Sequence, residues 1–379
     1  MLINNWYVLG LSGQVKDEPV GVHALNQDFV LFRDKDDKVH CLSDTCVHRG
    51  GSLCRGTVVD GTVECPYHGW RYDGAGQCVE IPSLGPDEKI PKRARVDSYP
   101  TDERWGWIWV FLGDLPESER PPLPEFFPEY DTPDSGWRYL RGEIVFDCNW
   151  VRAIENGVDR THAVWVHTDF GNPERKVPKP FEVIDANNSL YCKSKVKPLD
   201  KRGAWREVIP DNRDERDNVV QIYVPAPSIR IEMHMQPPKS MFIVTAYTPI
   251  NEHQTRLTFI HSRNFLTDEK YDEDTLKRMF LVLNEDAVIL NYLKPPRVPP
   301  TLSDELLLDS DRHGVMFRRK VKAREAAGDA IDSRAMQGED DYARVIPSPA
   351  RREDPKNWVL KPVLMRVAPG AGEAEAADG

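Results

Sequence analysis

Two short segments near the start of the chain each hold one cysteine and one histidine, and they constrain the local fold more than any other feature. The segments are Cys46-Val-His48 and Cys65-Pro-Tyr-His68. Each falls at or just after a predicted turn, so two loops can close on one metal centre from opposite sides. The chain between them must therefore fold so that the two loops meet.

The grouping of these ligands distinguishes between two kinds of metal centre. Two cysteines and two histidines would satisfy tetrahedral zinc. Zinc fingers, however, place their cysteines together and their histidines together, whereas each loop here holds one of each. Two thiolates suit one iron of a [2Fe–2S] cluster and two neutral imidazoles suit the other, which raises the reduction potential above that of an all-cysteine cluster. The spacing favours the cluster. The other cysteines are interpreted as buried small apolar residues: Cys41, Cys54, Cys78, Cys148 and Cys192.

The first third of the chain is predicted to be β structure. Val58-Val59 and Thr62-Val63 flank Asp60-Gly61, a strong hairpin signal because both central positions tolerate positive φ. Trp105–Leu112 is predicted to be a buried strand. Six prolines between Leu115 and Gly136 exclude a helix or a central strand there, so we place a domain boundary in this segment.

Beyond the boundary the pattern is mixed. A helical pattern covers Trp150–His162, and strand-like runs follow between residues 219 and 265. Thr267 can cap a long helix over Asp268–Leu293, which Pro295-Pro296 stops.

A second cluster of candidate ligands comprises Asp159, His162 and His167. Asp159 and His162 are three residues apart and would share a helix face. His167 lies about 140° round an ideal helix from His162, so the helix must widen or end for both rings to face one ion. By themselves, these residues could equally be core histidines or a surface cluster.

The long helix supplies a candidate carboxylate. Asp286 falls within an apolar stripe that includes Met279, Leu283 and Leu290. An unpaired carboxylate there would be costly to bury, and an iron ion is its natural partner. Glu285 is the alternative ligand, and either acid could instead lie at the solvent edge of the stripe. Adjacent helical residues point about 100° apart, so only one is expected to face the ion.

Charge and hydropathy exclude some partners. The net charge of −11 argues against nucleic acid or an anionic membrane surface. No stretch approaches the roughly 20 apolar residues of a membrane span. Met1–Trp6 shows no signal-peptide pattern, and seven cysteines do not suggest a disulfide scaffold. A cytoplasmic protein is expected.

The motifs together resemble those of a known family. Cys46-Val-His-Arg-Gly50 and Cys65-Pro-Tyr-His-Gly-Trp70 resemble the Rieske cluster motif. The pattern Asn156-x-x-Asp159-x-x-His162-x4-His167 resembles the iron-binding segment of the Rieske ring-hydroxylating oxygenase α-subunit family. The resemblance implies an α+β fold: an all-β Rieske [2Fe–2S] domain at 1–120 and a catalytic domain at 121–369 with an antiparallel sheet covered by helices. The composition of residues 370–379, rich in Gly, Ala and Glu, predicts a disordered tail.

The resemblance also implies the roles of the site residues. The cluster would be held by Cys46, His48, Cys65 and His68. Fe(II) would be held by His162, His167 and Asp286, with open positions for oxygen and water. Asp159 would bridge His162 to His68 of a neighbouring subunit in a homotrimer, and it would orient the ring of His162.

The function implied is that of a terminal oxygenase acting on a small aromatic compound with O2. No Gly-rich nucleotide-binding loop is recognised, so electrons are expected from a separate flavin reductase or ferredoxin. The chain is shorter than α-subunits that pair with β-subunits, and Trp150–Asp159 resembles carbazole-type oxygenases. Both favour the α-only group, which hydroxylates or removes O- or N-alkyl groups. Ring cis-dihydroxylation is the second candidate, and an electron carrier with a binding module is the competing class.

Overall fold

The computed structural model describes residues 1–85, 88–127, 135–167, 180–196, 215–236, 238–337 and 341–366. The predicted tail at 370–379 lies outside these residues. Contacts divide the chain into two units, Met1–Leu123 with Ala323–Gly379, and Pro124–Lys322. The domain limits 1–120 and 121–369 stay a prediction. The contacts group the C-terminal segment, from Ala323 onward, with the first unit.

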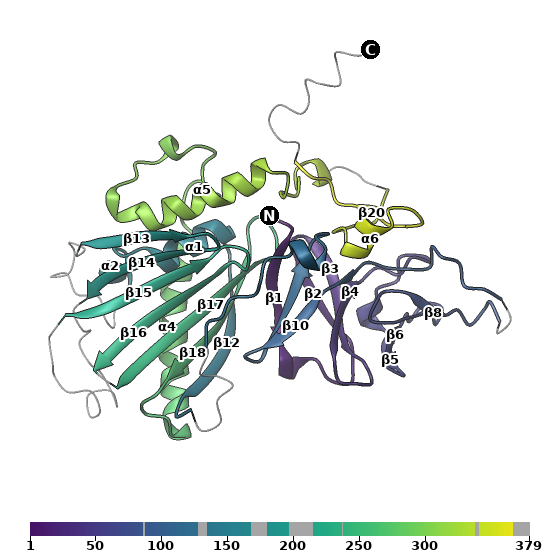
Figure 1. The fold of residues 1–379 in the computed structure, drawn as a ribbon, viewed down its shortest axis with the longest axis horizontal. Coiled ribbons are helices and arrows are strands. Elements are labelled where there is room, and N and C mark those ends of the chain that lie inside the picture. The colour runs from purple at the N-terminus through teal and green to yellow at the C-terminus, as the bar shows by residue number, and fades with distance from the viewer. Residues whose placement is uncertain are drawn as a thin grey trace, which may run out of the picture. The chain divides into compact units, whose positions relative to one another are not determined.

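The first unit is built mainly from small antiparallel sheets (Figure 1). Their strand orders are β1-β11-β10, β2-β3-β4-β9 and β5-β6-β7-β8. The strands are β1 Asn5–Leu11, β2 Val20–Ala24, β3 Gln27–Arg33, β4 Val39–Ser43, β5 Thr57–Val59, β6 Thr62–Glu64, β7 Arg71–Tyr72, β8 Cys78–Glu80, β9 Ser98–Tyr99, β10 Thr101–Arg104 and β11 Trp107–Leu112.

Two predictions for this unit are confirmed. β5 and β6 form the expected hairpin, and both turn residues have positive φ, 54° at Asp60 and 78° at Gly61. All residues of β11 are buried, as expected for the apolar run. That run begins two residues later than predicted, because Trp105 and Gly106 form the positive-φ turn that connects β10 to β11.

The C-terminal segment packs into the first unit through a buried ion pair. Asp97 is fully buried on the segment before β9, and its carboxylate accepts hydrogen bonds from Arg351 at 2.6 Å and from the Ser348 hydroxyl at 2.8 Å. A buried carboxylate is costly unless it is paired, so this contact fixes the segment. The segment contains α6 Pro349–Glu353 and the parallel strands β19 Arg344–Val345 and β20 Lys361–Pro362.

The second unit contains a seven-stranded antiparallel sheet in the order β12-β18-β17-β16-β15-β14-β13. Its strands are β12 Arg138–Phe146, β13 Phe181–Ala186, β14 Ser189–Val196, β15 Arg216–Tyr223, β16 Ser228–Gln236, β17 Lys239–Pro249 and β18 Thr255–Arg263. The helices are α1 Trp150–Val158, α2 Ala163–Val166, α4 Asp272–Leu290 and α5 Arg312–Ala326, whose last residues continue into the first unit. The α+β fold class is therefore confirmed.

Two helices cover the same face of this sheet. Gly142, Phe259, Thr245 and Ile229 lie opposite one another across four strands, so they point to one side. At one end of this row Phe259 contacts Phe280 of α4, with ring centroids 5.4 Å apart. At the other end, a Cβ on Gly157 of α1 would come within 2.7 Å of the Ile229 side chain. The tight approach of α1 to the sheet thus requires glycine at position 157.

No helix in the described part of the chain has the length and hydropathy needed to cross a membrane.

Candidate metal centres

The two Cys/His loops of the first unit have closely similar backbone conformations. The Cys46 carbonyl accepts a hydrogen bond from the Gly50 N–H at 2.9 Å, and the Cys65 carbonyl accepts one from the Gly69 N–H at 3.0 Å. Gly50 and Gly69 have φ of 70° and 69°, a conformation that favours glycine. The glycine four residues after each cysteine therefore closes the loop.

The structure brings these loops together. The rings of His48 and His68 lie with their centroids 4.3 Å apart, and a Cβ on Gly51 would come within 2.9 Å of Cys65 Sγ. Cys46 and Cys65 are buried, whereas both histidines are exposed. One pair of ligands therefore lies inside the unit and the other lies at its surface, as a two-iron cluster with different ligands on each iron would require.

Tyr72 on β7 extends this centre. Its hydroxyl lies 3.2 Å from Cys46 Sγ in a buried setting. Burial raises the pKa of the Cys46 thiol, although the Tyr72 hydroxyl lowers it in part. A thiolate at this position is therefore favoured when a cation lies beside it, and the tyrosine is placed to donate to its sulfur.

The second centre lies in the second unit. His162, His167 and Asp286 each offer a ligand atom within 4.8 Å of the others. His162 Nε2 is 3.4 Å from Asp286 Oδ1, and His167 Nε2 is 3.6 Å from the same oxygen. The three residues named from the sequence therefore converge at one point, with both rings turning the same nitrogen towards one carboxylate oxygen.

The helix carrying this segment ends earlier than predicted. α1 stops at Val158, and Asp159 is extended with ψ of 134°, so Asp159 and His162 do not share a helix face. The reason is local, because Asp159 Oδ1 accepts hydrogen bonds from both the N–H and the hydroxyl of Thr161 at 2.7 and 2.8 Å. The five-residue spacing is spanned by the short helix α2, which His162 precedes and His167 follows.

Asp286 occupies the buried stripe of α4, as expected. It is 7% exposed and lies among Thr275, Met279, Leu283 and Leu290 on the buried side of the helix. The start of the helix differs from the prediction, because Asp268 caps a 3-10 turn at Glu269–Tyr271 and α4 then begins at Asp272. The capping residue is therefore Asp268, and not Thr267 as predicted.

Glu285 is not at the solvent edge of the helix. Its side chain is 16% exposed, and its Oε2 lies 3.1 Å from His167 Nδ1. The apolar stripe of α4 leaves a solvent-edge position open for Glu285, because it reports only on neighbours within the helix. His167 lies 118 residues away in the sequence, so no local pattern could indicate this contact.

The donor set fits a divalent metal ion. The Oδ1 atom of Asp286 is buried without a hydrogen-bond partner among the described residues. Such a carboxylate oxygen is costly without a cation. Burial lowers the pKa of His162, but Asp159 and Asp286 outweigh it and raise this pKa to about 9. The surrounding carboxylates thus favour positive charge at this point. Two histidines and one carboxylate are a typical ligand set for non-haem Fe(II).

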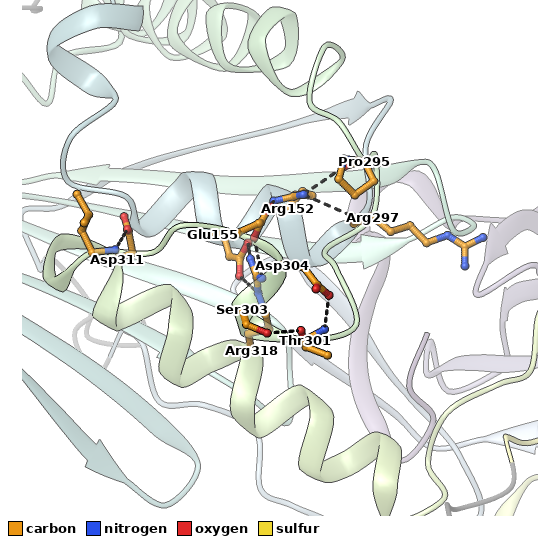
Figure 2. Close-up of polar contacts among 11 residues, drawn as sticks. Arg152, Glu155, Pro295, Arg297, Thr301, Ser303, Asp304, Asp311 and Arg318 are labelled. Carbon is orange, nitrogen blue, oxygen red and sulfur yellow. Dashed lines mark hydrogen bonds and ion pairs between the residues drawn. The ribbon is translucent and has the colours of Figure 1, made fainter.

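A buried charge network holds α1, the helix that leads into this site (Figure 2). Arg318 of α5 donates to both carboxylate oxygens of Glu155 at 2.7 Å and to Glu305 at 2.8 Å. Arg152 lies 2.7 Å from Glu305 and also donates to the Pro295 carbonyl at 3.1 Å. The network therefore ties α1 both to α5 and to the segment that follows α4, one helical turn before Asp159.

Replacing Arg318 with alanine is expected to destabilise the protein by on the order of 3 kcal/mol, because Glu155 would lose the cation that binds both of its oxygens while its side chain is only 17% exposed. Glu305 would keep its contact with Arg152. Arg319→Ala is the matched control, since this neighbouring arginine is exposed on the same helix. The control should change the free energy of unfolding by less than about 0.5 kcal/mol. Denaturant unfolding of both variants measures the difference, and equal midpoints would contradict a stabilising role for the network.

Two family models match the chain. The Rieske [2Fe-2S] domain matches residues 5–100, and the vanillate O-demethylase oxygenase C-terminal domain matches residues 146–327. The first match contains all four candidate cluster ligands. The second contains His162, His167 and Asp286.

Curated relatives match over different lengths. The putative toluene-4-sulfonate monooxygenase system iron-sulfur subunit TsaM2 of Comamonas testosteroni is 29% identical over 313 residues, which are 76% of this chain and 87% of that protein. The oxygenase component of dicamba O-demethylase from Stenotrophomonas maltophilia is 35% identical over 43% of this chain and 47% of its own length. The oxygenase subunit of tert-butanol monooxygenase / tert-amyl alcohol desaturase from Aquincola tertiaricarbonis is 36% identical over 43% of this chain, but only about a third of that relative's length is matched (34%).

Solved structures share the fold over most of the chain. Pseudomonas putida CBB5 NdmA with caffeine has a TM-score of 0.73 at 24% identity and covers 85% of this chain and 91% of its own. Dicamba monooxygenase bound to dicamba has a TM-score of 0.70 at 25% identity and covers 85% of this chain and 96% of its own.

Proposed function

The chain belongs to the Rieske non-haem iron oxygenase α-subunit family, and we propose that it is a terminal oxygenase that hydroxylates or oxidatively N- or O-dealkylates a small aromatic compound. The observation that carries the proposal is the second metal centre, where His162, His167 and Asp286 converge. An electron carrier with a binding module would need only the cluster. Dioxygen and electrons from a separate flavin reductase or ferredoxin are the co-substrates proposed.

The two cofactors divide the chemistry between them. When bound, the cluster supplies single electrons, and the mononuclear iron supplies the site where dioxygen is used to oxidise the substrate. The residues of the chain set the conditions for both. His48 and His68 are exposed, so electrons can enter and leave at the surface of the first unit. The Tyr72 hydroxyl lies 3.2 Å from Cys46 Sγ, and to a ligating thiolate it would be the donor. Hydrogen bonds to the ligand sulfurs help to set the reduction potential of such clusters.

Demethylation is the preferred reaction outcome, and the relatives support it. The C-terminal family model is that of a vanillate O-demethylase, and one relative is a dicamba O-demethylase. We therefore propose an aromatic substrate with an O- or N-methyl group and a role in aromatic compound catabolism. Ring cis-dihydroxylation is the alternative.

A homotrimer is the proposed assembly. Asp159 is 31% exposed at its side chain, and the neighbouring Trp165 is 67% exposed. Tyr67, whose ring centroid lies 3.9 Å from that of His68, is 61% exposed. Exposed aromatic side chains beside both centres are typical of surfaces that a partner covers. We propose that His68 of one subunit lies near Asp159 of the next, which would give electrons a route between the centres. The cytoplasm is the proposed compartment, because none of the seven cysteines, all of them described, forms a disulfide.

The test is oxygen consumption by the protein reconstituted with a reductase, on aryl methyl ethers, N-methyl heteroaromatics, arenesulfonates and unsubstituted arenes. We expect formaldehyde to be released in proportion to the oxygen consumed with a methylated substrate. His48→Ala should remove the visible absorption and the reduced-state EPR signal of the cluster, and should abolish turnover. One equivalent of zinc without acid-labile sulfide, or reduction without oxygen uptake on any substrate, would contradict the proposal.

A further inference from the structure

Each histidine of the mononuclear site lies between two carboxylates, and the outer carboxylate of His167 has no role in the function proposed above. We propose that Glu285 is a positioning residue that fixes the tautomer and the ring orientation of His167. The inference rests on the proposed function, because it assumes that His167 binds a metal ion through Nε2.

Two contacts of the His167 ring indicate which of its nitrogens carries the proton. Nδ1 lies 3.1 Å from Glu285 Oε2, within hydrogen-bonding distance, and Nε2 lies 3.6 Å from Asp286 Oδ1. An ionised carboxylate only accepts hydrogen bonds, and a neutral imidazole carries one N–H. The proton therefore belongs on Nδ1, where it is donated to Glu285. The lone pair of Nε2 is then free for the metal and faces the point between His162 and Asp286.

His167 needs such an external partner because of its place in the chain. It follows the last residue of α2 and has an extended backbone with ψ of 110°. A residue just beyond a helix of four residues is not oriented by regular helix packing. Glu285 sits on the much longer α4 and therefore gives the ring a fixed point of reference.

The contact of Glu285 is shorter and more buried than the equivalent contact at His162. The side chains of His167 and Glu285 are 3% and 16% exposed. Asp159 lies 3.6 Å from His162 Nδ1 and is 31% exposed. A charged acceptor strengthens a hydrogen bond in a buried environment and raises the basicity of the imidazole. The two outer carboxylates thus differ: Asp159 is accessible to a partner, whereas Glu285 acts within its own unit.

Glu285 is also poorly placed to be the metal ligand. It faces the Nδ1 side of the His167 ring, whereas the ligand atoms of the site converge on the Nε2 side. Glu285 and Asp286 are adjacent on α4 and point about 100° apart, so they contact His167 from different directions. The helix α4 therefore carries both the ligand Asp286 and Glu285, the residue that orients the second ligand, His167.

The test is the Fe(II) affinity of the full-length protein, measured by competition with a chelator after the mononuclear site has been stripped. Glu285→Ala should weaken Fe(II) binding by about 10- to 100-fold, the usual effect of removing the partner of a ligating histidine. Glu285→Gln should weaken it less, because its amide oxygen still accepts the proton on Nδ1 but carries no charge. Glu273→Gln, the same change at an exposed position of the same helix, is the control and should bind as wild type.

A second measurement separates positioning from general stability. The Mössbauer quadrupole splitting of isotopically enriched Fe(II) in the site should change in Glu285→Gln and stay unchanged in Glu273→Gln. Wild-type affinity and splitting in both Glu285 variants would overturn the inference, even if their melting temperatures fell. A complete loss of binding in both would make Glu285 a ligand instead. Failure of the wild-type protein to bind Fe(II) would reject the proposed function along with the inference.

Discussion

Asp286→Ala is expected to empty the mononuclear site and to abolish oxygen-dependent turnover, while the cluster keeps its absorption spectrum. Asp286 Oδ1 is the atom that both ligand histidines face, at 3.4 and 3.6 Å. Two histidines alone provide neither the third ligand nor the negative charge. The loss of Fe(II) affinity should therefore exceed the roughly 100-fold that removing a supporting residue can cause. Iron and sulfide analysis of the purified variant, with Fe(II) titration, measures the effect.

The stability of this variant without metal provides a second criterion. Asp286 is buried, and its Oδ1 has no hydrogen-bond partner among the described residues, so in the absence of metal it should destabilise the fold. We expect metal-free Asp286→Ala to melt no lower than metal-free wild type. Asp274→Ala is the control, because Asp274 lies on the same helix in an exposed pair with Arg278. Full iron occupancy in Asp286→Ala would reject this carboxylate as a ligand.

The sequence predicts those parts of both centres that depend on local geometry. The two Cys/His loops follow from residues a few positions apart, and the hairpin at residues 57–64 follows from Asp60-Gly61. Asp286 could be selected over Glu285 as the buried residue because the apolar stripe of α4 is a periodic pattern. In each case the determining residues are close together in the sequence.

The parts that the sequence does not predict depend on distant partners. Glu285 contacts His167 and Glu155 contacts Arg318, and the two glutamate side chains are only 16% and 17% exposed. Neither partner lies on the same element, so helical periodicity gives no indication of them. Asp97 and Arg351 are separated by 254 residues, and their ion pair assigns the C-terminal segment to the first unit. The pattern does not predict the strands β12, β13 and β14 either, because several of their residues are charged and their apolar alternation is incomplete.

The end of α1 shows how a short side chain can override a helical pattern. The pattern predicts a helix from Trp150 to His162, but the hydrogen bonds from Thr161 to Asp159 Oδ1 end it at Val158. The same bonds leave Oδ2 of Asp159 facing His162 Nδ1 at 3.6 Å. The turn therefore occupies Oδ1 of Asp159 and leaves Oδ2 to face His162. A substitution can then change the group that faces His162 and keep the hydrogen bonds of the turn.

Asp159→Asn is expected to keep both iron centres and to lose turnover by about 100-fold with the natural reductant. The asparagine side chain retains one oxygen, which can still accept the two hydrogen bonds from Thr161 and preserve the turn. Its amide nitrogen then takes the place of Oδ2. There it would meet the N–H of His162 Nδ1, so a favourable contact between a donor and an acceptor becomes a contact between two donors.

Single-turnover experiments on the pre-reduced protein with substrate bound provide the measurement. In wild type, oxidation of the cluster should accompany product formation, whereas in Asp159→Asn the cluster should stay reduced after oxygen is added. Asp217→Asn makes the same chemical change at an exposed position of β15 and should behave as wild type. Sedimentation of the variant establishes whether its assembly is unchanged, so that a lost subunit contact is not mistaken for a lost electron route. Wild-type turnover in Asp159→Asn, with both irons present, would show that electrons reach the mononuclear site without this carboxylate.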